Sequence, residues 1–288
     1  MMIKRIVKLS RRLIVNKLPP KMKIFIAKIL PRKLLNWYSE KSTDIFLISF
    51  PKCGRTWLRL MIGKVLQLHF NLVGEEVNIL ELHKLADLHP CIPRILVTHD
   101  DDPHWKRADE LDEKKLKYRD AKVIFLVRDP RDVIVSLYFH KKNRDDAYNG
   151  TISEFIHEEV GGIDTLIKFY KIWERNRCIP KDFLLVRYED IHKNPEKELR
   201  KILKFIGLEG IRNELIRKAV SFASFENMQR MERENRLGSF RLMPTNKADI
   251  NSYKTRRGKV GGYVDYLSKD EINFLNRKIG TSLRMYGY

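Results

Sequence analysis

The chain has 288 residues, of which 43% are hydrophobic and 33% charged, and its formal net charge is +20. This length is near the upper limit for one hydrophobic core, and no Pro-, Ser- or Gly-rich linker or repeat divides it. Its three cysteines, Cys53, Cys91 and Cys178, form no CxxC pair, which disfavours a disulfide framework or a zinc site and favours a reducing, cytoplasmic location. The charge would suit nucleic acid, but no nucleic-acid-binding motif is present, so we expect no such partner.

The first 39 residues contain eleven Lys or Arg and no acid, so they carry more than half of the net charge of +20. Apolar residues are interleaved with these cations at helical spacing, and Pro19-Pro20 divides the segment into two short helices. For this basic amphipathic extension, residues 1–40, two interpretations are open. It makes peripheral contact with an anionic membrane, or its apolar face packs on the protein's own sheet. The apolar run Ile24 to Ala27 is far too short for a signal sequence or a membrane span.

An anion-binding loop is predicted within residues 45–57, which read IFLISFPKCGRTW. The apolar run Ile45–Phe50 predicts a buried strand, and an apolar, helix-compatible segment at 58–68 follows the loop. Strand, tight loop and helix in this order point unpaired backbone N–H groups at one place. The ordinary P-loop ends in Gly-Lys-Ser/Thr, whereas here the lysine precedes the glycine. The residues suited to an anion are a glycine for close backbone approach, two cations and a hydroxyl: Gly54, Lys52, Arg55 and Thr56.

A histidine follows the next predicted strand, residues 94–98. The carboxyl ends of parallel strands meet at one edge of a sheet, so we expect His99 to lie near the first loop. Imidazole has a pKa suited to a general base. The carboxylates that follow it, Asp100, Asp101 and Asp102, allow a metal site as an alternative. We expect no metal, because the lysine and arginine of the loop already neutralise an anionic ligand.

Residues 121–140 repeat the pattern of strand, polar turn and helix. The predicted strand is 122–127 and the predicted helix 131–142, with Pro130 at its start. Arg128 can grip a phosphate bidentately at the strand end, and Ser136 can add a hydroxyl from the helix. The alternative is that Arg128 pairs with Asp129 or Asp132 and that Ser136 is only a small helix residue.

The remaining elements predict an α/β fold, specifically a P-loop-type three-layer sandwich with a mostly parallel central sheet and helices on both faces. One domain is expected over residues 41–288. Residues 235–262 show no periodicity and predict a mobile lid. Capping signals support several helix ends, among them Thr151 with Glu154 and Ser268 with Glu271. The fourth strand is expected at 183–188, and the other helices at 56–69, 79–88, 151–177, 195–207, 211–220 and 268–278.

Six segments of this sequence, taken together, resemble the sulfotransferase family. Phe50 to Trp57 is similar to its phosphosulfate loop, Tyr-Pro-Lys-Ser-Gly-Thr-Thr-Trp, but has Phe50, Cys53 and Arg55 in place of the tyrosine, the serine and the first threonine. Thr98-His99 resembles the family's Lys-Thr-His, with Val97 in place of the lysine. The others are Arg128 with Ser136, the strand ending in Tyr188-Glu189-Asp190, Ser224-Phe225-Glu226-Asn227-Met228, and Arg256-Arg257-Gly258 with Gly261-Gly262-Tyr263 in place of Gly-Asp-Trp.

The resemblance implies 3′-phosphoadenosine 5′-phosphosulfate as sulfuryl donor, without a metal. It implies that Arg128, Ser136 and the Arg256 loop read the 3′-phosphate, and that Tyr188 and Phe225 contact the adenine, with Trp57 able to complete an aromatic sandwich. It makes His99 the catalytic base, and Lys52 is suited to stabilise the leaving phosphate. The expected donor-binding set is Lys52, Cys53, Gly54, Arg55, Thr56, Trp57, Arg128, Ser136, Tyr188, Phe225, Arg256, Arg257 and Gly258.

The sequence thus predicts in-line sulfuryl transfer to a hydroxyl or amine of a small-molecule, glycan or lipid acceptor. Two alternatives remain. The first is a P-loop-type nucleotide kinase, against which the displaced lysine argues. The second is a catalytically silent sulfotransferase-like module that binds an anionic membrane or glycan through its basic N-terminus.

Overall fold

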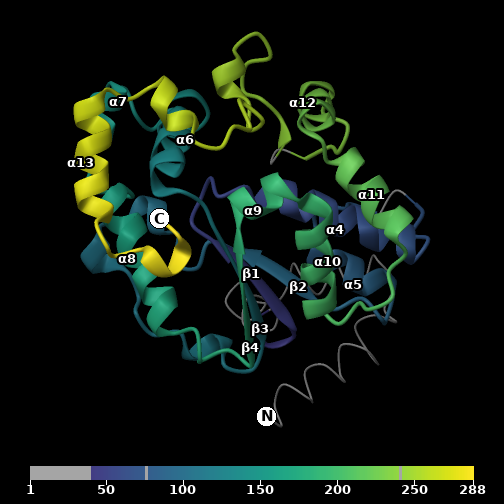
Figure 1. Ribbon diagram of the computed structural model, residues 1–288. Coiled ribbons are helices and arrows are strands. Elements are labelled where there is room, and N and C mark those ends of the chain that lie inside the picture. Colours follow the sequence, from purple (N-terminus) through teal and green to yellow (C-terminus); the bar gives the residue numbers. More distant parts are fainter. Residues whose placement is uncertain (1–39, 75–76, 240–241) are drawn as a thin grey trace, which may run out of the picture.

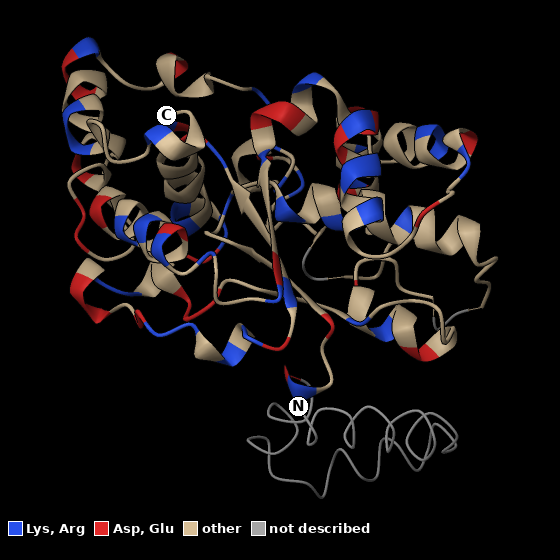
Figure 2. Cartoon of the chain, turned by 60° about the horizontal axis from the view of Figure 1, so that its bottom comes forward, with Lys and Arg blue, Asp and Glu red and all other residues tan. Residues whose placement is uncertain are grey.

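The structure is a computed structural model that describes residues 40–74, 77–239 and 242–288. The basic extension predicted for residues 1–40 therefore lies, up to residue 39, outside the described residues. Within the described ranges, none of the helices combines the length and the apolar character needed to span a bilayer. Figure 2 shows Lys and Arg mixed with Asp and Glu over the helices of the described chain.

A parallel sheet forms the centre of the molecule, with strand order β2-β1-β3-β4. All residues of β1 are buried, as are all those of β3 except its first, because helices cover both faces. The four predicted strands are confirmed to within one residue at each end. Their bounds are Ile45–Ser49 for β1, Ile95–Thr98 for β2, Lys122–Val127 for β3 and Asp182–Arg187 for β4.

Helices pack on both faces of this sheet, which confirms the predicted three-layer architecture. In Figure 1, α4, α5, α10 and α11 lie on one side of the strands, and α6, α8 and α13 lie on the other. On the first side the helices are α4 (Arg55–His69), α5 (Leu82–Leu88), α10 (Pro195–Phe205) and α11 (Asn213–Phe222). On the second side they are α6 (Pro130–Asn143), α8 (Ile163–Arg175) and α13 (Lys269–Ile279), with the single turn α7 at Ile152–Phe155.

The strand register places the predicted functional segments at one edge. Ile48 of β1 pairs with Thr98 of β2, the residue just before His99. Val127 of β3 pairs with Arg187 of β4, so the residues that follow them, Arg128 and Tyr188, lie at the same level. All four strands therefore deliver their following residues to the carboxyl edge of the sheet, where open α/β sheets bind ligands.

One predicted helix, residues 151–177, is wrong in its extent. The chain instead forms α7, turns through Gly161 and Gly162, and starts again as α8. Gly161 has φ +70°, and a Cβ there would lie 2.3 Å from the carbonyl oxygen of His104. The backbone N–H of Gly161 donates to the carbonyl of Lys106 at 2.7 Å. This close approach of two loops needs a glycine and interrupts the helix.

Two helices were not predicted, α9 at Tyr188–Lys193 and α12 at Phe225–Glu234. Ser224 caps α12, because its side chain accepts from the backbone N–H of Asn227 at 3.3 Å. The capping boxes predicted at Thr151 and Ser268 are confirmed. Of the segment predicted as a lid, the described part carries one short 3₁₀ turn, Ile250–Ser252, and contributes to the site below. Its mobility stays a prediction.

Candidate active site

A cavity of about 430 Å³ opens at the carboxyl edge of the sheet, a size typical of small-ligand sites. It brings together segments that are far apart in the sequence, from the loop after β1 to the loop before α13. Every residue of the predicted site lines it except Cys53. Those that do are Lys52, Gly54, Arg55, Thr56, Trp57, His99, Arg128, Ser136, Tyr188, Phe225, Arg256, Arg257 and Gly258.

The side chain of Cys53 points into the core instead. It is completely buried, and its Sγ lies 3.4 Å from the hydroxyl of Tyr170. Burial raises the pKa of the Cys53 thiol to about 12, so the thiol stays neutral. Of this residue, only the backbone remains available to a ligand.

The first loop has the backbone geometry of an anion cradle. Lys52 and Gly54 have φ of +72° and +88°, in the left-handed region. A Cβ at Gly54 would lie 2.5 Å from a ring carbon of Tyr188, so a larger residue would collide with that ring. Left-handed backbone at a lysine is strained and is typical of functional sites. Helix α4 begins at Arg55, so its first N–H groups lie beside the cavity.

Lys52 is the lysine of this loop, and its ammonium is easily deprotonated. Burial, followed by the charge of Arg144, lowers the pKa of Lys52 from 10.5 to about 7. An anion bound beside this group would favour its protonated form. Lys52 is therefore suited to respond to negative charge that develops in the cavity.

His99 lies at the cavity wall with both ring nitrogens engaged. Nδ1 is 2.9 Å from the carbonyl oxygen of Ser49, so Nδ1–H donates to it. Nε2 is 2.5 Å from a guanidinium nitrogen of Arg55, and it must accept because Arg55 can only donate. Burial, followed by the charge of Arg55, holds the pKa of His99 well below its usual 6.5. The imidazole is thus neutral, and Nε2 is the atom that can accept a proton.

Behind His99, three consecutive aspartates adopt left-handed backbone, with φ of +49°, +74° and +47° at Asp100, Asp101 and Asp102. Asp100 is buried and forms an ion pair of 2.7 Å with Lys115, and it accepts a hydrogen bond of 2.5 Å from Tyr118. Asp101 pairs with Lys106. These contacts hold the segment in a conformation that costs about 1–2 kcal/mol per residue.

The same contacts leave little room for the metal alternative. Asp100 and Asp101 are committed to lysines rather than turned toward His99. Across the ranges that the structure describes, no three His, Cys, Asp or Glu residues gather in a way that could hold a metal ion.

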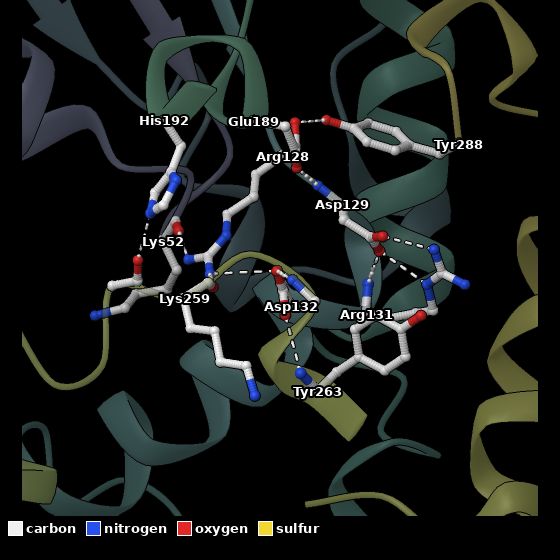
Figure 3. Close-up of polar contacts among 12 residues, drawn as sticks. Lys52, Arg128, Asp129, Arg131, Asp132, Glu189, His192, Lys259, Tyr263 and Tyr288 are labelled. Atoms are coloured by element: carbon white, nitrogen blue, oxygen red, sulfur yellow. Dashed lines mark hydrogen bonds and ion pairs between the residues drawn. The ribbon is translucent and has the colours of Figure 1, made fainter. Parts of the chain in front are cut away.

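Arg128 connects the loops that surround the cavity (Figure 3). Its guanidinium donates to the carbonyl of Lys52 at 3.3 Å and to the carbonyl of Lys259 at 3.0 Å. It also lies 3.4 Å from Asp132 and 4.3 Å from the ring centre of Tyr188. The alternative pairing with Asp132 thus exists, yet Arg128 still lines the cavity. Asp129 pairs with a different residue, Arg131, at 2.6 Å.

Asp132 fixes the C-terminal loop over the site. Its carboxylate accepts the backbone N–H groups of Gly261 at 2.9 Å and Tyr263 at 3.0 Å (Figure 3). The ring of Tyr263 packs under the guanidinium of Arg131, 4.5 Å away. Asp132 therefore holds this loop over the site, although Gly262 and Tyr263 stand where the similar motif of the sulfotransferase family has Asp-Trp.

The aromatic residues gather around the two cationic loops. The rings of Trp57 and Tyr188 meet edge to face, with centroids 5.6 Å apart. Gly258 has φ +61°, and a Cβ there would lie 2.6 Å from the ring of Phe225. Flat aromatic surface beside paired cations is the combination that binds a nucleotide base and its phosphates.

Several cavity residues were missed by sequence reasoning: His104, His140, His192, Lys254 and Lys259. Burial lowers the pKa of His104 to about 4, and burial with the charge of Lys52 lowers that of His140 to about 2. Spacing could have revealed two of them, because His140 lies one turn after Ser136 and His192 one turn after Tyr188. Lys254 lies in an irregular loop, so no periodic signal marked it.

Comparison with known proteins agrees with this geometry. The sulfotransferase domain family matches residues 42–287. Cytosolic sulfotransferase 12 of Arabidopsis thaliana is 25% identical over 84% of this chain and 78% of its own length. Flavonol 3-sulfotransferase of Flaveria bidentis is 24% identical over 87% of this chain and 85% of its own.

The fold of a mouse sulfotransferase, SULT7A1, solved in complex with PAP, is also similar. The two structures align with a TM-score of 0.57 at 22% identity, over 84% of each chain. The family match covers nearly the whole of the described chain, and the cavity lies where that family's motifs come together. The chain therefore belongs to the sulfotransferase family and is a sulfotransferase that uses 3′-phosphoadenosine 5′-phosphosulfate as its sulfuryl donor.

Proposed function

We propose that His99 is the general base and Lys52 the electrostatic catalyst of sulfuryl transfer to a hydroxyl acceptor. The observation that carries this proposal is that His99, Lys52 and Arg128 line a single cavity. The donor supplies the sulfuryl group, whose bond to the bridging oxygen breaks as a bond to the acceptor oxygen forms. His99 Nε2 takes the hydroxyl proton, and Lys52 neutralises the charge left on the bridging oxygen.

The other cavity residues hold the donor in this proposal. The loop from Lys52 to Thr56 binds the phosphosulfate end, and Trp57, Tyr188 and Phe225 bind the purine. The residues proposed for the 3′-phosphate are Arg128, Ser136, Arg256, Arg257 and Gly258. Two features support this fit: the cationic lining, and the glycines at which a Cβ would collide with Tyr188 and Phe225.

We further propose a cytoplasmic enzyme with a small-molecule acceptor. The names of the relatives support this, since one is a cytosolic sulfotransferase and another acts on a flavonol. Membrane contact through residues 1–39, and the domain boundary at 40, remain predictions. The family match supports neither the nucleotide kinase nor the silent module considered above.

Titration calorimetry with adenosine 3′,5′-bisphosphate tests the donor assignment, and we expect a dissociation constant in the micromolar range. A product that gains the mass of one sulfuryl group in a cell extract supplied with donor would support transfer. Magnesium-dependent ATP turnover without nucleotide bisphosphate binding would contradict the proposal.

Replacing Lys52 with Ala is expected to lower kcat by about 10²–10³-fold, comparable to the loss of one oxyanion-stabilising donor. The affinity for adenosine 3′,5′-bisphosphate should change much less, because Arg128 and the Arg256 loop remain. Single-turnover rates and calorimetry measure the two effects separately. A large loss of affinity with unchanged kcat would contradict the assigned role.

The variant Lys52→Arg is the matched control, because it keeps the charge but does not titrate. In the wild type, kcat/KM should fall as pH rises through about 7, because free Lys52 loses its proton there. It should also fall at acid pH, well below 6.5, where His99 becomes protonated. Lys52→Arg should remove the alkaline fall and leave the acid one. An unchanged alkaline fall would assign it to another group.

Arg55 is expected to contribute, after burial, to the low pKa of His99. Replacing it with Gln removes the charge but keeps an N–H donor, so the pKa of His99 should rise toward its usual value. Arg55→Lys keeps the charge and should leave the pKa low. Nuclear magnetic resonance of the His99 ring follows this titration directly. Equal His99 titrations in the two variants would show that burial, not Arg55, sets the pKa.

A further inference from the structure

The part of the cavity around His99 is polar rather than apolar. His99, His104 and His140 line it from three different elements, and the rings of His99 and His104 lie 5.6 Å apart. Of the hydrophobic side chains other than tyrosine that line the cavity, Trp57 and Phe225 belong to the proposed purine site. The others among the described residues are Pro51, Val135, Ala223 and Met228. An acceptor here meets imidazoles and basic side chains as well as hydrocarbon.

Lys254 adds a further basic side chain to the lining of the cavity. It comes from the loop before Arg256, not from the phosphosulfate loop. Burial, followed by the charges of Lys52, Arg144 and Arg55, holds the pKa of Lys254 well below its usual range, whereas Glu232 raises it. Lys254 therefore lies in a region of strong positive potential.

Two acids interact electrostatically with Lys254. Asp145 does not line the cavity, and its carboxylate lies 3.5 Å from His140. The other acid, Glu232, is engaged in hydrogen bonds. It is completely buried, and its Oε1 accepts the backbone N–H of Lys254 at 2.6 Å and lies 3.3 Å from Arg144. Its Oε2 accepts from the backbone N–H of Thr255 at 2.9 Å and from the hydroxyl of Thr255 at 2.6 Å. Glu232 thus holds the loop in place, and the basic side chains of Lys52, Arg55 and Lys254 line the cavity.

We propose that Lys254, together with His104 and His140, forms a subsite for an anionic group of the acceptor, so that the preferred acceptors are small hydroxylated molecules carrying a phosphate, carboxylate or sulfate. This inference rests on the proposed function, because it assumes that acceptors enter beside His99. It differs from the chemistry named for the flavonol-acting relative, whose acceptor is an aromatic polyphenol.

The neutral histidines are consistent with such a subsite. Neutral imidazole both donates and accepts hydrogen bonds, so His104 and His140 can bind hydroxyls next to the anion. An anion beside Lys254 also raises the pKa of its ammonium. Binding at mildly alkaline pH should therefore take up protons from the buffer.

The test uses two phenols that differ in one group, 4-hydroxybenzoate and 4-hydroxybenzyl alcohol. Calorimetry is carried out on the full chain saturated with adenosine 3′,5′-bisphosphate, in two buffers of different ionisation enthalpy. We expect the carboxylate to bind about tenfold more tightly than the alcohol. This preference corresponds to less than the full attraction between two close charges in a partly buried site. We also expect proton uptake with the carboxylate only.

Lys254→Gln should abolish both the preference and the proton uptake, whereas Lys142→Gln, an exposed lysine on α6 outside the cavity, should change neither. The inference is overturned if the carboxylate binds no better than the alcohol or not at all in the millimolar range. It is also overturned if the preference survives in Lys254→Gln, which would assign it to Lys52. Failure to bind adenosine 3′,5′-bisphosphate in the first titration contradicts the proposed function instead.

Discussion

Replacing His99 with Ala is expected to lower the rate of sulfuryl transfer by about 10²–10⁴-fold, the usual contribution of a general base. The reason is that, in the proposed mechanism, Nε2 of His99 accepts the proton, and its tautomer is fixed by the carbonyl of Ser49. Nucleotide affinity should be nearly unchanged. Single-turnover assays at saturating donor measure the rate, and calorimetry measures the affinity.

His192→Ala is the matched control, because His192 lines the same cavity but contacts the opposite end. Its Nε2 lies 3.0 Å from the carbonyl of Gly258, in the loop proposed to hold the 3′-phosphate. We expect this variant to weaken nucleotide binding and to preserve the single-turnover rate at saturation. If the two variants lost rate and affinity in the same proportion, His99 would not be the base.

Replacing Lys115 with Met is expected to destabilise the fold by about 3–5 kcal/mol, the usual cost of leaving one member of a buried ion pair alone. Lys115 and Asp100 are each only 2% exposed, and their charged atoms lie 2.7 Å apart. Without the ammonium, the Asp100 carboxylate keeps the hydrogen bond from Tyr118 but loses its buried counter-ion. Urea-induced unfolding followed by fluorescence measures the change.

Lys117 offers an internal comparison, since it pairs with the same Asp100 at 3.2 Å but its side chain is 44% exposed. Lys117→Met should cost less than about 1 kcal/mol, as is typical of exposed pairs. The double variant Lys115→Met/Asp100→Asn should recover much of the loss, because asparagine tolerates left-handed backbone and carries no charge. Equal losses for the two lysines would refute the buried-pair explanation.

Much of the fold could be predicted from the sequence because its strands are short apolar runs that end in polar turns. The helix predicted over 151–177 failed for a tertiary reason. The turn at Gly161 is imposed by contact with the loop at His104, which lies 57 residues earlier in the sequence. Helix α9 was missed because its first residue, Tyr188, follows directly on β4.

The donor side of the site was easier to predict than the acceptor side. Residues such as Gly54 and Arg128 follow strands, and their positions are fixed by the sheet. The position of Lys254 depends on hydrogen bonds from its loop to the buried Glu232, and no local sequence pattern predicts these bonds. The inward turn of Cys53 likewise depends on packing against Tyr170 from α8.

The contacts of the Arg128 guanidinium affect which nucleotides can fit the cavity. By holding the carbonyls of Lys52 and Lys259 together, it sets the separation between the two loops before any molecule enters. The distance between the two loops therefore limits the length of a ligand that can contact both of them. In the proposed binding mode, a nucleotide that lacks charge at either end would contact only one of the two loops, so we expect it to bind more weakly.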